Sequence, residues 1–505
     1  MAVATSSDRI AVQQGDDRLT YGELWASVWG AAEMVAGATH LAHIGPNGLA
    51  FPVALFGAAA AGIPLIPLNY RLSDDQLDSM LRAHPDSIVV VEPERAPALA
   101  ARGHRVVDTA AFLERARAGG EPGEVPGDGE AVALLLYTSG TTSSPKAAVL
   151  RHRHLTAYVL GAVEFGAADE TDAVLVSVPP YHIAGVANLL SNTYLGRRLV
   201  YLDHFDAARW METAREQQIT HAMVVPTMLA RLADLLDDAA ARGELDQVRP
   251  PSLRALSYGG ARTPATVLER VMARLPETGL TNAYGLTETS STISVLGPDD
   301  HQAAFASEYP AVRGRLSSAG RVLPGVDVEV RDPDGAVVPA LEAGEIFVRG
   351  EQVSGEYEGR ASVLEEGWFP TRDRGWLDAD GFLFIEGRSD DTIIRGGENV
   401  APAEIEEVLG RHPDVESCAV VGIDDEEWGQ RIAAVVVLKD GAAADAEDLR
   451  TFVRAALRSS KTPDLVAFVD ELPYTETGKL LRRDVRSDLV RSLGSTARSA
   501  PAPTI

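Results

Sequence analysis

A short stretch rich in Thr, Ser and Gly, residues 138–146, has the residue types needed to bind a polyanion. It follows an apolar run, residues 132–136, that predicts a buried strand, and it precedes residues 154–165, which can form a helix. The glycine and the small hydroxyl residues leave backbone N–H groups free for an anion, and Lys146 adds a positive charge. The stretch therefore favours nucleotide phosphates as its ligand, with an ordinary turn as the alternative. It is not a Walker A loop, because it lacks the Gly-Lys-Ser/Thr ending.

Four later segments carry side chains that suit the rest of a nucleotide. They are Asn-Ala-Tyr-Gly-Leu-Thr-Glu-Thr at 282–289, Thr-Arg-Asp-Arg-Gly-Trp at 371–376, Gly-Arg-Ser-Asp-Asp at 387–391 and Thr-Gly-Lys at 477–479. In this order, with the first loop, they resemble the adenylate-forming superfamily of acyl-CoA synthetases, aryl-CoA ligases, peptide-synthetase adenylation domains and luciferases. The resemblance covers about residues 19–486, nearly the whole chain, and is strongest to fatty- and aryl-acid CoA ligases.

This resemblance implies a reaction in two halves. A carboxylate attacks the α-phosphate of ATP and gives an acyl-adenylate and pyrophosphate; a thiol, usually that of coenzyme A, then displaces AMP. The implied enzyme is an acid–thiol ligase, an AMP-forming acyl-CoA synthetase. Its cofactors would be ATP, Mg²⁺ and coenzyme A, and its substrate a small carboxylic acid.

The resemblance also assigns the nucleotide contacts. The phosphates would lie against the first loop, at Thr138, Ser139, Gly140, Thr141, Thr142 and Lys146. Tyr284 would stack on the adenine, with Gly259, Gly260 and Ala261 along the base and the acyl pocket. Asp373 would accept hydrogen bonds from the ribose 2′- and 3′-hydroxyls, and Arg388 would reach ribose or phosphate.

Four residues are candidates for the chemistry itself. Thr287 would contact the α-phosphate, and Glu288 would hold Mg²⁺, because a hard cation prefers carboxylate and phosphate oxygens. Lys479 would bridge the attacking carboxylate and the α-phosphate, where charge builds up in the transition state. His182 would line the acyl pocket or gate the thiol. A structural histidine, a surface glutamate and a lysine on an ordinary turn are the respective alternatives.

The second half-reaction needs a channel for the pantetheine arm. Gly396 and Gly397 resemble the loop that meets the thiol after a small domain rotates, and glycine pairs let a backbone approach a slim ligand closely. Asp390 occupies the hinge position of the superfamily. Two domain arrangements would then use one site for two steps.

The first loop departs from the superfamily pattern at two positions. Ser143 and Ala147 stand where glycine is usual, and a Cβ restricts the backbone. These departures predict a stiffer loop and slower adenylation. They also motivate one alternative, a catalytically degenerate nucleotide-binding homologue. Another alternative is a stand-alone ligase that passes its acyl-adenylate to a carrier protein or another nucleophile, and an oxygenase of the luciferase kind is a third.

Composition excludes several partners. The formal net charge of −27, from 73 acidic and 46 basic residues, argues against nucleic acid and anionic membranes. The single cysteine, Cys418, allows no intrachain disulfide and fits a cytoplasmic protein. Residues 49–68 carry no charge, but Pro and Gly interrupt them, which predicts a short buried helix and a strand rather than a membrane span.

Strand-like and helix-like segments alternate over the first 300 residues, which predicts layered α/β subdomains with mostly parallel sheets. Short strands with Asp-Gly turns after residue 325 predict a β-rich subdomain. We expect a large N-terminal adenylation domain at 1–389, a small mobile α+β domain with the catalytic lysine at 390–491, and a disordered tail at 492–505. A homodimer is left open.

The acid is expected to be aryl or medium-chain. By resemblance, the acid pocket is lined by His182, Asn188, residues 258–261, Gly285 and residues 292–294. Several of these are small, which leaves volume for such an acid. None is Arg or Lys, which disfavours a dicarboxylate.

Overall fold

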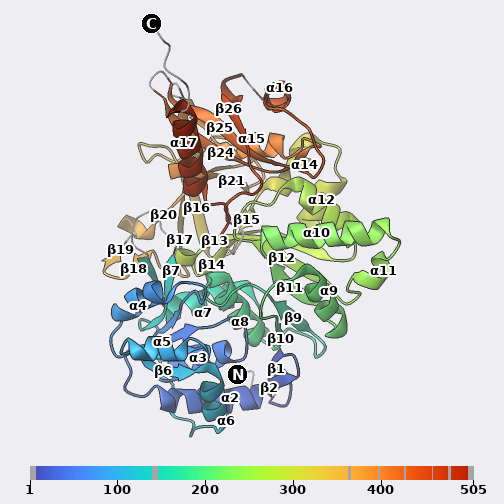
Figure 1. Ribbon diagram of the computed structural model, residues 1–505. Coiled ribbons are helices and arrows are strands. Elements are labelled where there is room, and N and C mark those ends of the chain that lie inside the picture. Colours follow the sequence, from blue (N-terminus) through green and yellow to red (C-terminus); the bar gives the residue numbers. More distant parts are fainter. Residues whose placement is uncertain are drawn as a thin grey trace.

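The computed structural model describes residues 7–138, 146–361, 365–395, 398–425, 428–457, 459–475 and 479–498, and their strands form three sheets (Figure 1). Eight described strands form the first sheet, in the order β19-β18-β8-β7-β4-β3-β5-β6. Strands β3 to β7 of this sheet are parallel, and β8 is antiparallel to β7. Their bounds are β3 Leu41–Ile44, β4 Leu65–Pro67, β5 Ile88–Val91, β6 Arg105–Asp108, β7 Val132–Thr138, β8 Lys146–Arg151, β18 Glu356–Tyr357 and β19 Arg360–Ala361.

Thirteen described strands form the large sheet, in the order β16-β17-β20-β21-β15-β14-β13-β12-β11-β9-β10-β1-β2. One half is parallel, from β13 to β1. Its strands are β1 Ile10–Gln14, β9 Ala173–Val176, β10 Arg198–Tyr201, β11 His221–Val224, β12 Ala255–Gly259 and β13 Gly279–Leu286, with β2 Asp17–Thr20 antiparallel at the edge. The other half is antiparallel: β14 Ser291–Leu296, β15 Gly320–Val322, β16 Val326–Arg331, β17 Gly344–Gly350, β20 Phe369–Leu377 and β21 Phe382–Arg388. The predicted β-rich segment is therefore present, but it continues the large sheet rather than forming a sheet of its own.

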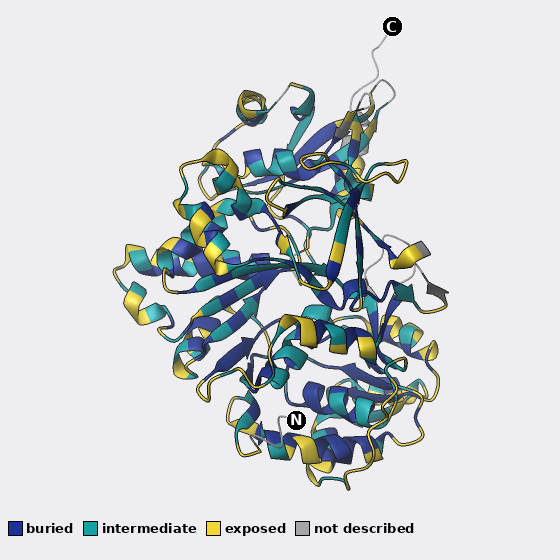
Figure 2. Ribbon diagram, turned by 180° about the vertical axis from the view of Figure 1, so that it is seen from behind, coloured by how far each residue is buried: buried dark blue, intermediate teal, exposed yellow. Residues whose placement is uncertain are grey.

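Helices cover both faces of these two sheets. Between the sheets, apolar side chains of α2 (Tyr21–Met34), α3 (Ala50–Ala60), α6 (Thr109–Arg117), α7 (His152–Ala162) and α8 (Ile183–Leu195) share one core with both. Helices α9 (Ala207–Glu216), α10 (Pro226–Ala241) and α12 (Ala265–Arg274) cover the far face of the large sheet, and α4 (Asp74–Arg82) lies on the far face of the first. The remaining helices here are α5 Ala96–Ala101, α11 Leu245–Val248, α13 Pro298–Ala306 and α14 Pro310–Arg313. Figure 2 shows the buried residues concentrated along the strands and on the inner sides of these helices. The predicted α/β layering is confirmed.

The uncharged segment at residues 49–68 folds as predicted, into helix α3 followed by strand β4. Eight of its helical residues are buried, because α3 is apolar all round and lies between layers. Within the described part of the chain, no helix combines the length and the apolar character needed to cross a bilayer.

Five described strands form a third sheet, which begins with β22 at Ile393. They are β22 Ile393–Arg395, β23 Glu398–Val400, β24 Val415–Asp425, β25 Gly429–Leu438 and β26 Leu465–Phe468. Helices α15 (Pro402–Leu409) and α16 (Ala446–Ala456) pack on one face, and α17 (Arg482–Arg498) packs on the other. Burial in this sheet raises the pKa of the Cys418 thiol, in keeping with a packing role. Helix α17 continues past residue 492, where the sequence predicts the tail to begin; residues 499–505 lie outside the described residues.

Candidate active site

The predicted phosphate loop joins two antiparallel strands. Thr138, the last residue of β7, pairs with Lys146, the first residue of β8. Helix α7 follows only after β8, a strand that the sequence pattern did not predict. Residues 139–145 therefore join two paired antiparallel strands and do not lead directly into a helix. Its residues Ser139, Gly140, Thr141 and Thr142 lie outside the described residues.

Ala147 is a strand residue rather than a loop residue. Its side chain is 4% exposed and packs in the core with Leu135 and Val149, and its carbonyl accepts a 2.9 Å hydrogen bond from the Glu358 N–H. Its φ is not among the positive values found in the described chain, so glycine's special conformations are not needed here. The expectation that Ala147 stiffens the loop is therefore wrong. The matching expectation for Ser143 falls outside the described residues.

Ala147→Gly should lower stability without speeding adenylation. It removes a buried methyl group and adds backbone freedom to a strand, at a combined cost of about 1–2 kcal/mol. Thermal unfolding measures the loss, and acid-dependent pyrophosphate release measures the rate. Ala148→Gly, the neighbouring buried strand position, is the matched control. A rate gain in Ala147→Gly alone would contradict this assignment.

Tyr284, Asp373 and Arg388 come together from three strands of the large sheet. The Tyr284 hydroxyl, on β13, donates to a carboxylate oxygen of Asp373 on β20 at 2.6 Å, and Arg388 on β21 donates to the other oxygen at 3.0 Å. Asp373 and Arg388 are register partners, and the Asp373 residue is only 7% exposed. Burial, together with Asp373, raises the pKa of Tyr284, so its hydroxyl stays neutral and can donate. The cluster thus presents an aromatic ring, a carboxylate and a guanidinium side by side.

Glu288 lies next to this cluster in a short 3₁₀ turn, Thr287–Thr289, directly after β13. It is 7% exposed, and its carboxylate accepts a short hydrogen bond from the Tyr357 hydroxyl of β18. Burial and the nearby carboxylate raise the pKa of Tyr357. The sequence did not predict Tyr357, since no motif marks it and it lies 69 positions from Glu288. Among the described residues, no three His, Cys, Asp or Glu side chains gather as a metal site, so a cation at Glu288 would need phosphate oxygens as further ligands.

Lys479 reaches the same cluster from the third sheet's domain. Its ammonium group interacts electrostatically with Arg388, Asp373, Asp391 and Glu288. Lys479 is an exposed residue, yet partial desolvation of its ammonium group, and then Arg388, lower its pKa. Hydrogen bonds from the Lys479 N–H to the Thr475 hydroxyl (3.0 Å) and from the Thr475 N–H to the Lys479 carbonyl (2.8 Å) close the turn that carries it. Lys479 therefore lies within electrostatic range of Asp373, Arg388 and Glu288, and its role toward them stays a prediction.

The glycines at the end of β12 allow the strands to approach closely beside Tyr284. A Cβ at Gly259 would collide with the carbonyl oxygen of Ala283 on β13, and Gly260 has a φ of +88°. Ala261 follows directly in the chain, half-buried. Tyr258, expected in the acid pocket by resemblance, instead buries its ring in the core and bonds His301 at 2.8 Å. That expectation is wrong, because side chains alternate along β12 and Tyr258 faces α10 and α12.

His182 caps the start of α8 and packs against Tyr181, with ring centroids 4.6 Å apart. Burial lowers the pKa of His182 to about 4, so the ring is neutral near pH 7. It can accept one hydrogen bond and donate one but supplies no charge. Among the described residues, no hydrogen bond, ion pair or ring contact joins it to the Asp373 cluster. Gly396 and Gly397 lie outside the described residues.

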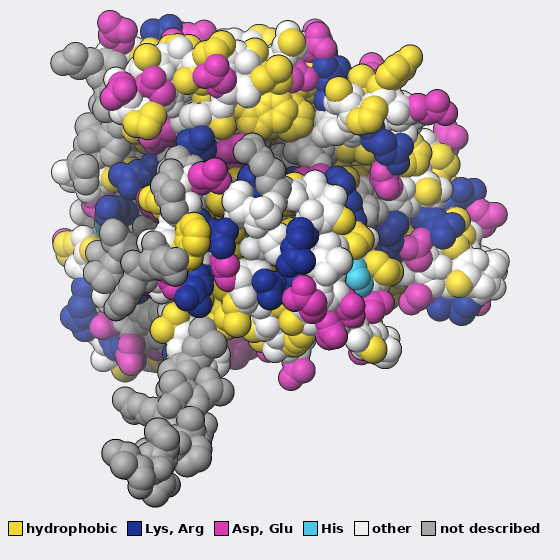
Figure 3. Space-filling view, turned by 90° about the horizontal axis from the view of Figure 1, so that it is seen from above, with side chains coloured by type: hydrophobic (Ala, Val, Ile, Leu, Met, Phe, Trp, Pro, Cys, Tyr) yellow, Lys and Arg dark blue, Asp and Glu magenta, His cyan; other side chains and the backbone are white. Residues whose placement is uncertain are grey.

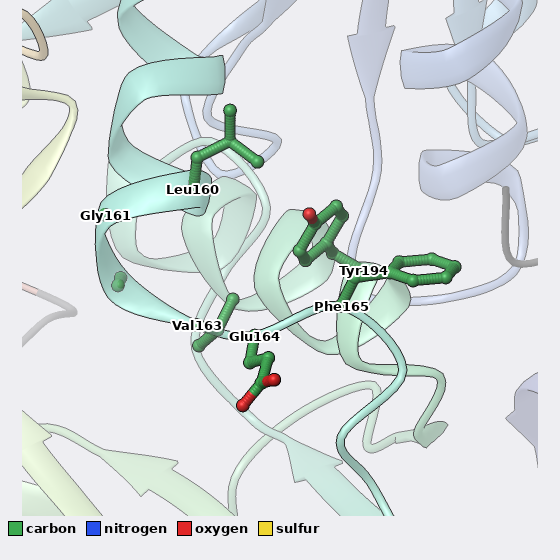
Figure 4. A pocket seen from close by; sticks show the side chains of 7 residues that line it. Leu160, Gly161, Val163, Glu164, Phe165 and Tyr194 are labelled. Carbon is green, nitrogen blue, oxygen red and sulfur yellow. The ribbon is translucent and has the colours of Figure 1, made fainter.

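A separate surface pocket lies where α7 ends against α8 (Figure 4). Phe165 and Tyr194 meet edge to face there, with centroids 5.2 Å apart, beside Leu160 and Val163. Its one charged residue is Glu164, and it contains no cation to attract phosphate. This pocket includes none of the predicted site residues.

Comparison with known proteins agrees with this geometry. The model of the AMP-binding enzyme family matches residues 1–358, and that of the AMP-binding enzyme C-terminal domain matches residues 404–479. This chain belongs to the AMP-binding enzyme family. The predicted membership of the adenylate-forming superfamily is confirmed, and with it the predicted class of enzyme, an acid–thiol ligase.

Relatives of this AMP-binding enzyme align over nearly its whole length. It is 34% identical to feruloyl-CoA synthase from Amycolatopsis sp, over 94% of this chain and 95% of the relative. It is also 34% identical to 2-succinylbenzoate–CoA ligase from Geobacillus kaustophilus, over 95% of both chains. The o-succinylbenzoate CoA synthetase of Bacillus subtilis, solved with its acyl-adenylate intermediate, superimposes with a TM-score of 0.83 at 27% identity, over 96% of both chains. The predicted fold class, with a large N-terminal and a small C-terminal part, is confirmed.

Proposed function

We propose that this enzyme couples an aromatic carboxylic acid to coenzyme A through an acyl-adenylate. The observation that carries the proposal is the position of Lys479, in the part of the chain that forms the third sheet, within electrostatic range of Arg388, Asp373 and Glu288 on or beside the large sheet. The substrate class is supported by the relatives, which include a feruloyl-CoA synthase and an indoleacetate–CoA ligase. Medium-chain acids are the second class to test.

The chemistry follows from the charges of the cluster. Joining a carboxylate to an α-phosphate brings two anions together, so cations fixed in place lower the barrier most. Lys479 would neutralise the attacking carboxylate and the α-phosphate, and Arg388 would hold ribose or phosphate. Asp373 would accept both ribose hydroxyls by exchanging its bond from Tyr284, whose ring would then lie against adenine. Thr287 and the loop at 138–146 would donate to phosphates.

The metal and the thiol complete the site. Mg²⁺, held by Glu288 and phosphate oxygens, would neutralise the phosphates as they separate. Tyr357 would keep the Glu288 carboxylate oriented in its absence. His182, near the start of α8, would line the acid, and Gly396 and Gly397 would flank the pantetheine arm of coenzyme A.

Coenzyme A is not the one candidate acceptor of the acyl group. A fatty acid–[acyl-carrier-protein] ligase from Streptomyces coeruleorubidus is 32% identical over 91% of this chain. A carrier protein is therefore the second candidate acceptor. On the surface seen from the small-domain end, basic and acidic side chains are interspersed (Figure 3). An acidic partner would be attracted by a surface with mainly basic side chains, which this view does not show.

We further propose that residues 1–389 and 390–491 move relative to each other. In support, the large sheet ends with β21 at Arg388 and the third sheet begins at Ile393. The contact between them that includes Arg262 involves few groups: its guanidinium donates to the Ala403 carbonyl of α15 at 2.9 Å and pairs closely with Glu407. Such a contact is easily broken and re-formed, as a two-step enzyme requires.

Arg262→Ala should slow acyl-adenylate formation about fivefold, because it removes roughly 1 kcal/mol of bonding from a partly exposed contact. Thioester formation from a supplied acyl-adenylate should not slow. Single-turnover assays of each half-reaction measure the difference. Arg411→Ala is the matched control, since Arg411 pairs with the same Glu407 at 2.6 Å within the small domain. Equal slowing of both half-reactions would refute the assignment of Arg262 to this arrangement.

Acid-dependent pyrophosphate release from MgATP tests the proposed function. Cinnamic, benzoic and indoleacetic acids are compared with C4–C16 fatty acids, each with and without coenzyme A. Turnover that needs an aromatic acid and coenzyme A supports the proposal. Release without a thioester product would replace coenzyme A by a carrier protein or another nucleophile. ATP binding without release with any acid would favour the degenerate homologue.

A further inference from the structure

In the middle of the large sheet, the side chains on one face are buried and those on the other face are partly accessible to solvent. Along β11, β12 and β13, Ala222, Leu256 and Leu280 are buried against α10 and α12. The residues that alternate with them and face the opposite side are partly accessible although these are central strands: His221, Ala255, Ser257, Thr281 and Ala283. Helix α8 covers this second side, because Val174 and Val176 of β9, which pair in register with His221 and Met223, pack against it. These strand residues and α8 therefore bound a partly accessible region, the crevice.

A chain of side-chain hydrogen bonds crosses the far end of this crevice. The Arg197 guanidinium donates to Asn192 Oδ1 at 3.0 Å, and Asn192 Nδ2 donates to the Asn188 carbonyl at 2.8 Å and to Asn188 Oδ1 at 3.3 Å. Because a guanidinium can only donate, it fixes which way the Asn192 amide faces, and Asn192 then fixes Asn188. We call this chain from Arg197 through Asn192 to Asn188 the relay. At its end, the Nδ2 group of half-buried Asn188 can donate to a ligand.

Contacts with His221 on β11 and with Asp172 hold Arg197 in place. Its other terminal nitrogen lies 2.9 Å from His221 Nε2, and its Nε lies 3.7 Å from Asp172, which is only 5% exposed. Burial and Arg197 lower the pKa of His221 to about 4, so the ring is neutral and its Nε2 accepts from Arg197. Because Arg197 bonds both Asn192 and His221, the relay faces β11. Asn188, one helical turn nearer His182, faces the same crevice.

The charge of Arg197 is balanced within a group of two guanidinium groups and two carboxylates. Asp172 lies beside Arg197 and also pairs with Arg254, which lies 3.8 Å from Asp169. Arg197 is therefore a fixed donor to Asn192 rather than a cation free to pair with a second carboxylate. The residues predicted to line the acid pocket include no Arg or Lys. The structure brings Arg197 to its far end, and the conclusion against a dicarboxylate now rests on Asp172 and Asp169.

We propose that Asn188 Nδ2 donates a hydrogen bond to an acceptor oxygen on the ring of the acid, and that Arg197 and Asn192 are positioning residues that aim it. This inference rests on the proposed function and narrows its substrate to oxygen-substituted aromatic acids. The distance along α8 fits such an acid. Asn188 lies six residues after His182, which is roughly 9 Å at the rise of an α-helix, and this length suits an arylpropenoic acid. An unsubstituted ring would leave the amide donor without a partner, which costs binding.

The test compares cinnamic acid with its 3-methoxy and 4-methoxy derivatives, because a methoxy oxygen only accepts. The readout is the ratio of kcat/KM, methoxy over unsubstituted, from pyrophosphate release. We expect the wild-type enzyme to favour at least one methoxy acid by about tenfold. Asn192→Asp keeps the shape and the bond from Arg197 but cannot donate to Asn188, so the Asn188 amide turns over and presents its oxygen. The ratio should then fall about tenfold or more, mainly through KM.

Two further variants make the result decisive if Asn192→Asp folds poorly. Asn188→Leu removes the donor at a half-buried helix position, and Arg197→Met removes the start of the relay; each should lower the same ratio. Arg254→Met, which takes a charge from the same Asp172 without touching Asn192, should leave the ratio unchanged. A wild-type ratio of one or less, or a ratio that survives these changes, overturns the inference alone. No turnover of any of the three acids by the wild type overturns the proposed function and this inference with it.

Discussion

Replacing Lys479 with alanine should reduce acyl-adenylate formation by about 10²–10³-fold, the usual effect of losing one fixed group that stabilises developing charge. The ammonium group of Lys479, in the small domain, lies within electrostatic range of Asp373, Arg388 and Glu288. The transfer of a supplied acyl-adenylate to coenzyme A should remain near the wild-type rate, because that step joins no second anion to the phosphate. Pyrophosphate release and thioester formation from synthetic acyl-adenylate measure the two steps separately.

Lys439→Ala is the control for this change. Lys439 belongs to the same domain and donates to the Pro413 carbonyl on the exposed surface, so its loss should change neither step. If Lys479→Ala slowed both half-reactions alike, Lys479 would be holding the small domain together rather than acting in adenylation.

The pH dependence offers a second view of Lys479. Partial desolvation and Arg388 lower its pKa from the usual value of 10.5. The protonated form carries the charge that adenylation needs, so activity is present below this lowered pKa and is lost as the pH rises through it. We expect the alkaline limb of pyrophosphate release to lie below pH 10.5. Lys479→Arg, if active, should move the limb upward, since a guanidinium stays charged.

Asp373→Asn should raise the KM for ATP about 10–100-fold, the range expected when charge-assisted hydrogen bonds are lost in a buried site. Asp373 is 7% exposed and satisfies both Tyr284 and Arg388, at 2.6 and 3.0 Å. The amide keeps the shape but leaves the Arg388 charge without its partner. Steady-state kinetics with varied MgATP measure the change.

The nucleotide analogue 2′-deoxy-ATP separates a ribose contact from a structural role. If Asp373 accepts from the 2′-hydroxyl, the wild type should prefer ATP, and Asp373→Asn should lose most of that preference. Asp327→Asn, on the exposed ion pair with Arg349, is the matched control and should behave as wild type. A preference for ATP that persists in Asp373→Asn would assign Asp373 to holding Tyr284 and Arg388 in place.

Local pattern was enough to predict many elements. The strand predicted at residues 132–136 lies on β7, and the short helix and strand predicted within residues 49–68 are α3 and β4. The apolar periodicity of such an element and the Gly or Pro residues that end it are local features, so the sequence shows them directly. Strand β8 was missed because its residues 146–151 mix charged ends with a short apolar run.

The sequence by itself determined the inventory of this enzyme: an acidic α/β chain with five segments that match the adenylate-forming superfamily, among them Tyr284, Asp373, Arg388 and Lys479. Only the tertiary structure decided which of them meet. The bond between Glu288 and Tyr357 spans 69 residues, and that between Tyr284 and Asp373 spans 89. Such contacts depend on strand register and on which face of a strand is buried, and a shift of one residue would reverse both. For the same reason, the sequence does not show the relay that starts at Arg197. The relay depends on the contact between Arg197, just after α8, and His221 on β11.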